Sequence, residues 1–317
     1  MTRVAAERAA DYRARGLWDD ATLWRRAVQH ANERPDALAV ADRDGERTHS
    51  CRAVVDRAPA FAAHLHAHGG EAAAVVSIQL PNQLEAVVAA LAAQALGAVV
   101  NPLLPGYRQR ELEHVFRVAK PRAIVTPARY RRFDHAPLVD AVREATGVAP
   151  WHVTAGGLEP DARDDDAETG DATFDDACAS APLDDAKSGG DASAISEVIF
   201  TSGTEAAPKA VLHTEETTNF SVRAAWDDMQ LADGDVVWMP SPVGHSTGFN
   251  YGLRMALYHG LPLVLQDRWS PEQAARLVER FGCSYTLAAT TFLQDLVELA
   301  RAGRRDLSAL RCFGCGG

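Results

Sequence analysis

A short stretch between residues 200 and 211 holds the side chains best suited to chemistry. It reads Phe-Thr-Ser-Gly-Thr-Glu-Ala-Ala-Pro-Lys-Ala-Val, so three hydroxyls, a glycine and a lysine lie between two apolar runs. Backbone N–H groups and hydroxyl donors in such a loop can bind a polyphosphate, and Lys209 adds a positive charge. The same composition also occurs in ordinary turns. The stretch therefore predicts a phosphate-binding loop, with a plain turn as the alternative.

The stretch differs from the common phosphate loop of nucleotide hydrolases. That pattern is Gly-x4-Gly-Lys-Ser/Thr, whereas Lys209 follows a proline and has no second glycine before it. Residues 193–200 are predicted to form a strand before the loop, and a helix is predicted to begin near Thr214 after it. An unrelated phosphate-loop hydrolase stays open as an alternative, although the loop lacks the Lys-Ser/Thr pair that this class needs.

The loop resembles the phosphate-binding motif of the adenylate-forming enzymes, the AMP-binding family of acyl-CoA synthetases, aryl-CoA ligases and luciferases. That motif runs Thr-Ser-Gly-Thr, then Thr or Ser, Gly, any residue and Pro-Lys-Gly. The matching positions are Thr201, Ser202, Gly203, Thr204, Pro208 and Lys209. The chain departs from the motif at Glu205, Ala206 and Ala210, of which the two alanines replace glycines. The variant loop is most similar to those of ligases for short, cyclic or medium-length carboxylic acids.

A second motif of the same family lies downstream. Residues 238–249 read Trp-Met-Pro-Ser-Pro-Val-Gly-His-Ser-Thr-Gly-Phe and fit the family's Pro-x-x-His segment, which here ends at His245. The resemblance implies that His245 borders the carboxylate being activated, and that Phe249 and Thr290 form walls of the acyl pocket. A structural histidine at a strand end is the alternative.

The resemblance also extends upstream. Leu-Pro-Asn at residues 80–82 precedes an alanine-rich helix, and Gly-Ala-Val-Val-Asn-Pro-Leu at residues 97–103 ends the next predicted strand. Both resemble early signatures of the family, and three further segments after residue 259 fit in the same order. The resemblance therefore covers about residues 20–317.

The resemblance implies a reaction in two steps. A carboxylate attacks the α-phosphorus of ATP to give an acyl-adenylate and pyrophosphate, and the acyl group then passes to a thiol, usually that of coenzyme A. By the same resemblance, Mg²⁺ and the residues Thr201, Ser202, Gly203, Thr204 and Lys209 hold the β- and γ-phosphates. The expected substrate is a small carboxylic acid.

The family's later motifs do not occur in this sequence. They are the adenine-binding Tyr-Gly-x-Thr-Glu, the ribose-binding aspartate and the catalytic lysine of a small C-terminal domain. We therefore expect the sequence to represent the N-terminal part of such an enzyme, inactive on its own. The alternative is a non-catalytic remnant that at most binds nucleotide or a protein partner.

Predicted strands and helices alternate along the chain, which indicates an α/β fold with two packed, mostly parallel sheets. Residues 156–192 hold 12 acidic and 2 basic side chains, so most of the net charge of −11 is concentrated there. Such a segment is typical of a solvated linker. It predicts a first subdomain over residues 1–155 and a second over residues 193–317.

Local signals predict some element boundaries. A helix is expected from Ala21 to Asn32 with Asp20 as its cap, and a hairpin is expected around Asp44-Gly45. Residues 53–68 are predicted to be helical, with a kink or break at Pro59.

Composition argues against several other classes of protein. The longest apolar run, residues 86–100, is too short for a membrane span of about 20 residues, and the N-terminus does not resemble a signal peptide. The sequence has no basic patch with interleaved aromatic residues, so we do not expect it to bind nucleic acid. Five scattered cysteines indicate reduced thiols and a cytoplasmic protein. The sequence leaves the oligomeric state open.

Two clusters contain residues of types that can bind metals, but a purely structural role is favoured for both. Cys312 and Cys315 form a Cys-x-x-Cys pair, but a zinc site requires further ligands, so a strand and turn is favoured. His64, His66 and His68 do not share one helix face, which favours a solvated helix end over a metal site.

Overall fold

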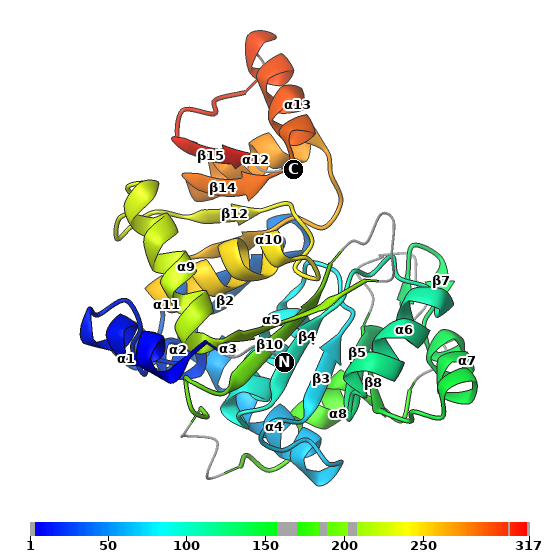
Figure 1. The fold of residues 1–317 in the computed structure, drawn as a ribbon. Coiled ribbons are helices and arrows are strands. Elements are labelled where there is room, and N and C mark those ends of the chain that lie inside the picture. The colour runs from blue at the N-terminus through cyan, green and yellow to red at the C-terminus, as the bar shows by residue number, and fades with distance from the viewer. Residues whose placement is uncertain (1–3, 157–169, 184–188, 202–207, 304, 316–317) are drawn as a thin grey trace.

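The computed structural model describes residues 4–156, 170–183, 189–201, 208–303 and 305–315. Helices and strands alternate along most of the chain, because short apolar runs are separated by longer amphipathic segments. Two largely parallel sheets result, one in the lower and one in the upper half of Figure 1. The predicted α/β class with two packed, mostly parallel sheets is confirmed.

The lower sheet contains seven strands within the described residues. In spatial order they are β11 (Ala210–Thr214), β10 (Ile195–Phe200), β4 (Val99–Pro102), β3 (Val75–Ile78), β5 (Ala123–Pro127), β8 (Trp151–Ala155) and β9 (Ala172–Thr173). Neighbouring strands are parallel except β10 and β11, which are antiparallel. The central strands β3, β4 and β5 are buried along almost their whole length, as parallel strands with helices on both faces are.

The upper sheet contains six strands within the described part of the chain. In spatial order they are β15 (Cys312–Cys315), β14 (Tyr285–Ala288), β12 (Val237–Met239), β13 (Leu263–Leu265), β1 (Leu38–Asp42) and β2 (Arg47–Ser50). Only β1 and β2 pair in antiparallel fashion, and they form the hairpin predicted around Asp44-Gly45. A separate small hairpin joins β6 (Arg129–Tyr130) and β7 (Phe133–Asp134).

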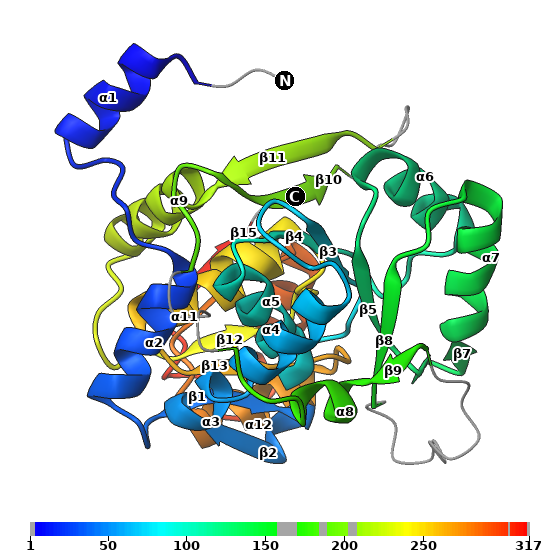
Figure 2. The ribbon, with the colours of Figure 1, turned by 90° about the horizontal axis from the view of Figure 1, so that it is seen from below.

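Helices cover both sheets and fill the space between them. They are α1 (Ala6–Ala14), α2 (Leu23–Glu33), α3 (Cys51–Val55), α4 (Ala58–Ala67), α5 (Leu84–Ala95), α6 (Gln109–Ala119), α7 (Ala136–Thr146), α8 (Phe174–Cys178), α9 (Glu215–Asp228), α10 (Ser246–Gly248), α11 (Met255–His259), α12 (Pro271–Phe281) and α13 (Thr290–Arg301). A π-helical turn, Phe249–Arg254, joins α10 to α11. Helix α5 lies at the centre, where every residue except Glu85 is buried (Figure 2). Its many alanines allow close packing on all sides.

Each sheet contains strands from both the N-terminal and the C-terminal half of the chain. The early hairpin β1–β2 pairs with β13 of the upper sheet, and β10 pairs with β4 of the lower sheet. The sheets therefore do not coincide with the segments 1–155 and 193–317 that the sequence suggested as subdomains. Pairing between strands far apart in sequence leaves no local signal, so a boundary inferred from composition could not reveal it.

A side-chain cap and a proline mark the starts of two helices near the N-terminus. Helix α2 begins at Leu23, because the hydroxyl of Thr22 accepts a hydrogen bond from the Arg25 N–H at 3.3 Å. The predicted cap at Asp20 was therefore wrong by two residues. The predicted break at Pro59 is confirmed, since α3 ends at Val55 and Pro59 lies in the first turn of α4.

The acidic segment is partly folded. Within residues 170–183, β9 adds to the edge of the lower sheet and α8 packs on α4. The ring of Phe174 in α8 is buried and stacks on Phe61 with centroids 4.5 Å apart. Residues 157–169 and 184–188 lie outside the described residues. The prediction of a solvated linker over 156–192 was therefore wrong for its middle part, because β9 pairs with β8 and Phe174 is buried.

The histidines at the end of α4 pack on an aromatic ring. The indole N–H of Trp151 donates to Nε2 of His64 at 3.1 Å, and the His68 ring stacks on Trp151 with centroids 3.8 Å apart. The expected solvated helix end is therefore wrong for these two residues. Among the described residues no group of three or more metal-binding side chains could hold an ion, and all five cysteines are unpaired.

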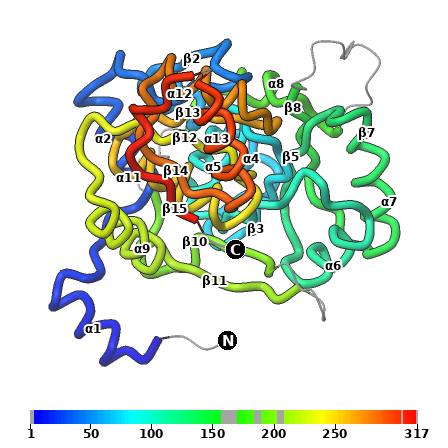
Figure 3. Tube along the Cα trace, turned by 90° about the horizontal axis from the view of Figure 1, so that it is seen from above, coloured from blue at the N-terminus to red at the C-terminus, as the bar shows by residue number. Residues whose placement is uncertain are grey.

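Helix α1 extends from the body of the molecule, as Figures 2 and 3 show. None of its nine residues, all within the described part of the chain, is buried. Arg13 nevertheless connects it to α9 through two hydrogen bonds to the carboxylate of Glu216, at 2.6 and 3.0 Å. No helix among the described residues is long and apolar enough to cross a bilayer.

Candidate functional site

The predicted phosphate loop connects two antiparallel strands. Strand β10 ends at Phe200, β11 begins at Ala210, and these two residues are partners in the sheet register. A helix was predicted to follow the loop directly, but β11 intervenes before α9 begins at Glu215. This extra strand covers Ala210–Thr214 and includes the apolar Val211 and Leu212, and Thr214 then caps α9 by accepting from the Thr217 N–H at 3.3 Å.

The base of the loop is closed by a reciprocal pair of hydrogen bonds. The Thr201 N–H donates to the Lys209 carbonyl at 3.0 Å, and the Lys209 N–H donates to the Thr201 hydroxyl oxygen at 3.0 Å. Both residues are exposed. The other three predicted phosphate ligands, Ser202, Gly203 and Thr204, lie outside the described residues. Thr201 and Lys209, the two predicted phosphate ligands that the structure describes, are thus adjacent at the base of this hairpin.

The strand before the loop is held in place by a buried asparagine from the upstream motif. Asn101, at the end of β4, donates from Nδ2 to the Val198 carbonyl at 2.8 Å and accepts from the Ser77 hydroxyl at 2.9 Å. The motif Gly-Ala-Val-Val-Asn-Pro-Leu therefore holds the strand that precedes the predicted phosphate loop through its asparagine. This role was not predicted, since one asparagine in an apolar strand gives no indication of its partner.

The predicted carboxylate-side histidine begins a short helix. His245 is exposed, its Nδ1 accepts the Thr247 N–H at 3.2 Å, and its carbonyl accepts the Phe249 N–H at 2.8 Å. Phe249 is buried and opens the π-helical turn. Single π-helical turns occur often at functional sites. Thr290 is exposed and begins α13, directly after β14.

Two glycines let this histidine segment lie close against its neighbours. A Cβ atom on Gly244 would lie 2.1 Å from the Leu103 carbonyl oxygen, and one on Gly248 would lie 2.2 Å from the Pro242 carbonyl oxygen. A larger residue at position 244 would push the segment away from Leu103, which follows β4, and one at position 248 would collide with the backbone of the segment itself. Parallel α/β sheets bind their ligands at such carboxyl ends of strands.

Asn82 of the Leu-Pro-Asn motif joins the two sheets at this point. Its side-chain nitrogen lies 3.0–3.1 Å from three backbone carbonyls, those of Met239, Ser241 and Gln266, and its oxygen accepts the Val243 N–H at 2.8 Å. The side chain is 2% exposed. Asn82 therefore fixes the chain between β12 and His245 relative to α5.

Replacing Asn82 by alanine is expected to lower the free energy of unfolding by about 2–3 kcal/mol, because four backbone groups lose a buried partner. Urea denaturation monitored by tryptophan fluorescence measures this change. The exposed Asn32, whose oxygen accepts from Arg52 at 3.2 Å, is the matched control, and Asn32→Ala should cost less than about 0.5 kcal/mol. Equal costs for the two variants would contradict the role of Asn82.

A buried ionic network connects the two candidate motifs. Arg254, the last residue of the π-helical turn, donates to Glu215 at 2.6 Å and to Glu197 at 3.2 Å, and both of its partners are also buried. Asn250 donates to Glu197 at 2.9 Å and Asn219 accepts from Arg254 at 3.0 Å. Burial alone would lower the pKa of Arg254, but the two carboxylates outweigh it and raise the pKa. The network was not predicted from the sequence.

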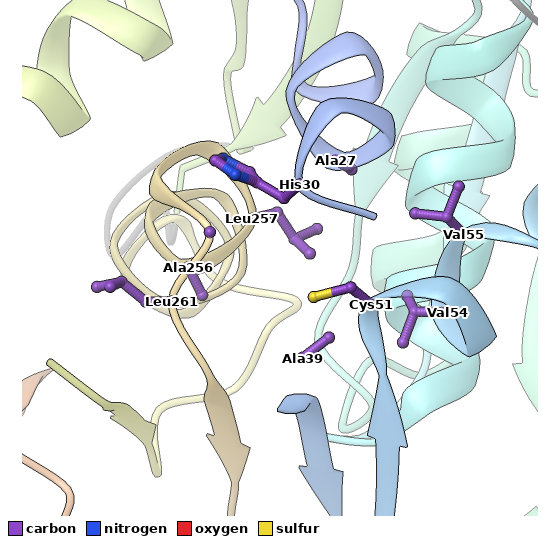
Figure 4. Close-up of a pocket in the computed structure, with 10 residues that line it drawn as sticks. Ala27, His30, Ala39, Cys51, Val54, Val55, Ala256, Leu257 and Leu261 are labelled. Atoms are coloured by element: carbon purple, nitrogen blue, oxygen red, sulfur yellow. The ribbon is translucent and has the colours of Figure 1, made fainter. Parts of the chain in front are cut away.

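A small apolar cavity lies away from these motifs, between α2, α3 and α11 (Figure 4). Its volume is about 20 Å³, room for about one water molecule. The Cys51 sulfur faces it, and burial raises the pKa of that thiol. Ligand sites of enzymes have volumes of about 300–1,000 Å³, so this cavity is a packing defect of the core.

Comparison with known proteins agrees with the geometry. Residues 27–317 match the family model described as AMP-binding enzyme. The chain is 32% identical over 321 residues to the medium-chain fatty-acid–CoA ligase of Escherichia coli (strain K12), covering 98% of this chain and 54% of that protein. It is 31% identical over 277 residues to the 2-hydroxy-7-methoxy-5-methyl-1-naphthoate–CoA ligase of Streptomyces carzinostaticus, covering 86% and 49% of the two chains.

Solved structures show the same fold. The apo structure of MbtA from Mycobacterium smegmatis superposes with a TM-score of 0.84 at 25% identity, covering 100% of this chain and 56% of that one. The AMP complex of O-succinylbenzoate coenzyme A synthetase (MenE) from Bacillus subtilis superposes with a TM-score of 0.73 at 18% identity, covering 94% and 68%. The chain spans about half the length of the sequence relatives it matches. On the match of its sequence and fold over nearly its whole length, this chain belongs to the AMP-binding enzyme family.

Proposed function

We propose that the protein containing this chain activates a carboxylic acid with ATP and transfers the acyl group to coenzyme A. A carboxylate oxygen attacks the α-phosphorus, and the bond to pyrophosphate breaks. The thiol sulfur of coenzyme A then attacks the acyl carbonyl carbon, loses its proton, and displaces AMP. The names of the relatives, fatty-acid and aryl-acid CoA ligases, support this reaction class.

The observation that carries the proposal is the closed hairpin at the end of β10. It joins Thr201 and Lys209 by two hydrogen bonds at the ends of the loop that matches the family's phosphate-binding motif. Thr201 and Lys209, with Ser202, Gly203 and Thr204, would bind the β- and γ-phosphates. Mg²⁺ would supply further charge neutralisation there. Catalysis then consists of positioning and charge stabilisation.

The second motif provides the proposed acid side of the site. His245 would border the substrate carboxylate, and Phe249 and Thr290 would line the acyl pocket. The exposed His245 imidazole is held by its bond from Thr247, and the buried Phe249 follows one helical turn later. A protein that binds nucleotide or a protein partner without catalysis is the second candidate.

Isotope exchange between pyrophosphate and ATP tests the proposal. The protein is offered acetate, medium-chain fatty acids and aryl acids in turn. Exchange that depends on one of these acids supports adenylation. ATP binding without exchange for any acid supports the second candidate, and the absence of both activities excludes the two together.

Lys209→Ala is expected to slow acid-dependent pyrophosphate exchange about 10- to 100-fold, because one positive charge on the phosphates is lost. Lys209→Arg should retain more activity, since the charge remains. Arg8→Ala is the control, because Arg8 is an exposed cation on the projecting helix α1. Unchanged exchange in Lys209→Ala would remove Lys209 from the proposed phosphate site.

A further inference from the structure

One side chain of a neighbouring helix contacts both ends of the loop. His114 lies on α6, and its Nε2 donates to the Pro208 carbonyl at 2.7 Å. The same imidazole packs edge to face on Phe200, with ring centroids 5.8 Å apart. Phe200 directly precedes Thr201, and Pro208 directly precedes Lys209. His114 therefore touches the chain immediately before it enters the loop and again before it leaves.

The contact restrains one particular peptide group. The Pro208 carbonyl and the Lys209 N–H belong to the same planar peptide unit. The carbonyl accepts from His114, and the N–H donates to the Thr201 hydroxyl at 3.0 Å. The peptide plane is thus held at both of its polar atoms. Rotation of this plane would break both bonds and would change the direction in which the Lys209 side chain leaves the backbone.

Helix α6 is well placed to act as the fixed support. Leu112, Val115 and Phe116 are buried, so they anchor the helix on the lower sheet. His114 is half-buried at the side of this apolar face. The Pro208 carbonyl can only accept a hydrogen bond, so Nε2 of His114 must carry the proton, both in the neutral ring and in the protonated ring.

We propose that His114 is a positioning residue that orients Lys209 for the nucleotide phosphates. The proposal rests on the phosphate-binding role of Lys209 given above. It adds a residue from α6, outside both motifs, to the set that determines ATP affinity. His114 does not itself touch the nucleotide, so its effect reaches the phosphates only through the Pro208–Lys209 peptide.

Two variants separate the hydrogen bond from the packing. His114→Phe keeps an aromatic ring against Phe200 but removes the donor, and His114→Gln restores an N–H donor of similar reach. Val118→Ala is the control, because Val118 is 50% exposed on the same helix. Amide hydrogen exchange of Thr201 and Lys209 and the Kd for Mg·ATP are measured for each protein. Neither readout requires catalysis.

We expect His114→Phe to speed exchange of the Lys209 amide at least about fivefold and to weaken Mg·ATP binding about 3- to 10-fold, within the range for one neutral hydrogen bond. His114→Gln should recover most of both effects, and Val118→Ala should match the wild type. Unchanged amide exchange or an unchanged Kd in His114→Phe overturns the proposal. If these effects appear while no acid supports pyrophosphate exchange, the inference on His114 stands and the proposed reaction falls. If the wild type catalyses acid-dependent pyrophosphate exchange while His114→Phe leaves the Kd for Mg·ATP unchanged, the proposed reaction stands and the inference on His114 falls.

Discussion

Replacing Arg254 by methionine is expected to lower the free energy of unfolding of this chain by about 3–5 kcal/mol. The guanidinium lies between the carboxylates of Glu197 and Glu215, at 3.2 and 2.6 Å, and all three side chains are at most 3% exposed. Methionine has a similar length and fills the space, but it leaves two negative charges in the core without their cation. The cost comes from these unpaired charges and exceeds the value of the ion pairs themselves.

Urea denaturation of the wild type and the variant measures the loss. Arg305→Met is the matched control, since Arg305 pairs with Glu279 at 2.9 Å but both side chains are about one-third exposed. That variant should lose less than about 1 kcal/mol. Adding Glu197→Gln and Glu215→Gln to Arg254→Met should recover part of the loss, because the amides carry no charge. A loss in Arg254→Met no larger than in Arg305→Met would show that the buried carboxylates do not depend on Arg254.

This network is an example of a feature that the sequence does not reveal, in contrast to several local elements. The α/β class, the β1–β2 hairpin and the break at Pro59 follow from local patterns, so they could be predicted. Glu197, Glu215 and Arg254 are each the kind of residue that usually lies on a surface. Only the fold brings them together from β10, α9 and the π-helical turn, and no spacing in the sequence indicates it.

The same distinction applies to the candidate site. Thr201, Lys209 and His245 could be identified because their motifs are continuous in the sequence, and their chemical roles stay predictions. Asn82 and His114 act on residues about 160 and 94 positions away, through single side-chain bonds to the backbone. Such contacts have no sequence signature. Strand β11 was missed for a different reason, because two apolar residues beside a helix cap are too short a run to distinguish strand from helix.

Acid is expected to destabilise the chain through two buried histidines of the lower sheet and its covering helices. His135 precedes α7 and is fully buried, and His152 of β8 is 1% exposed. Burial is the main cause that lowers the pKa of each to about 4, and the nearby Arg108 and Arg143 add to the effect. An unfolded histidine has a pKa near 6.5. Between pH 6.5 and 4 the unfolded chain therefore binds these protons and the folded chain does not.

Stability must then fall as the pH is lowered through this window. Each histidine should contribute a loss of about 2 kcal/mol between pH 7.5 and pH 5. Denaturation curves at pH 7.5, 6.5, 5.8 and 5.0 measure the slope. His135→Leu and His152→Gln should each reduce it by up to one proton, about 1.4 kcal/mol per pH unit. Val139→Ala, a fully buried site on α7 without a titrating group, should lower stability equally at every pH. A wild-type slope retained in both histidine variants would mean that other groups cause the acid sensitivity, whereas a smaller slope in each variant would assign it to these two imidazoles.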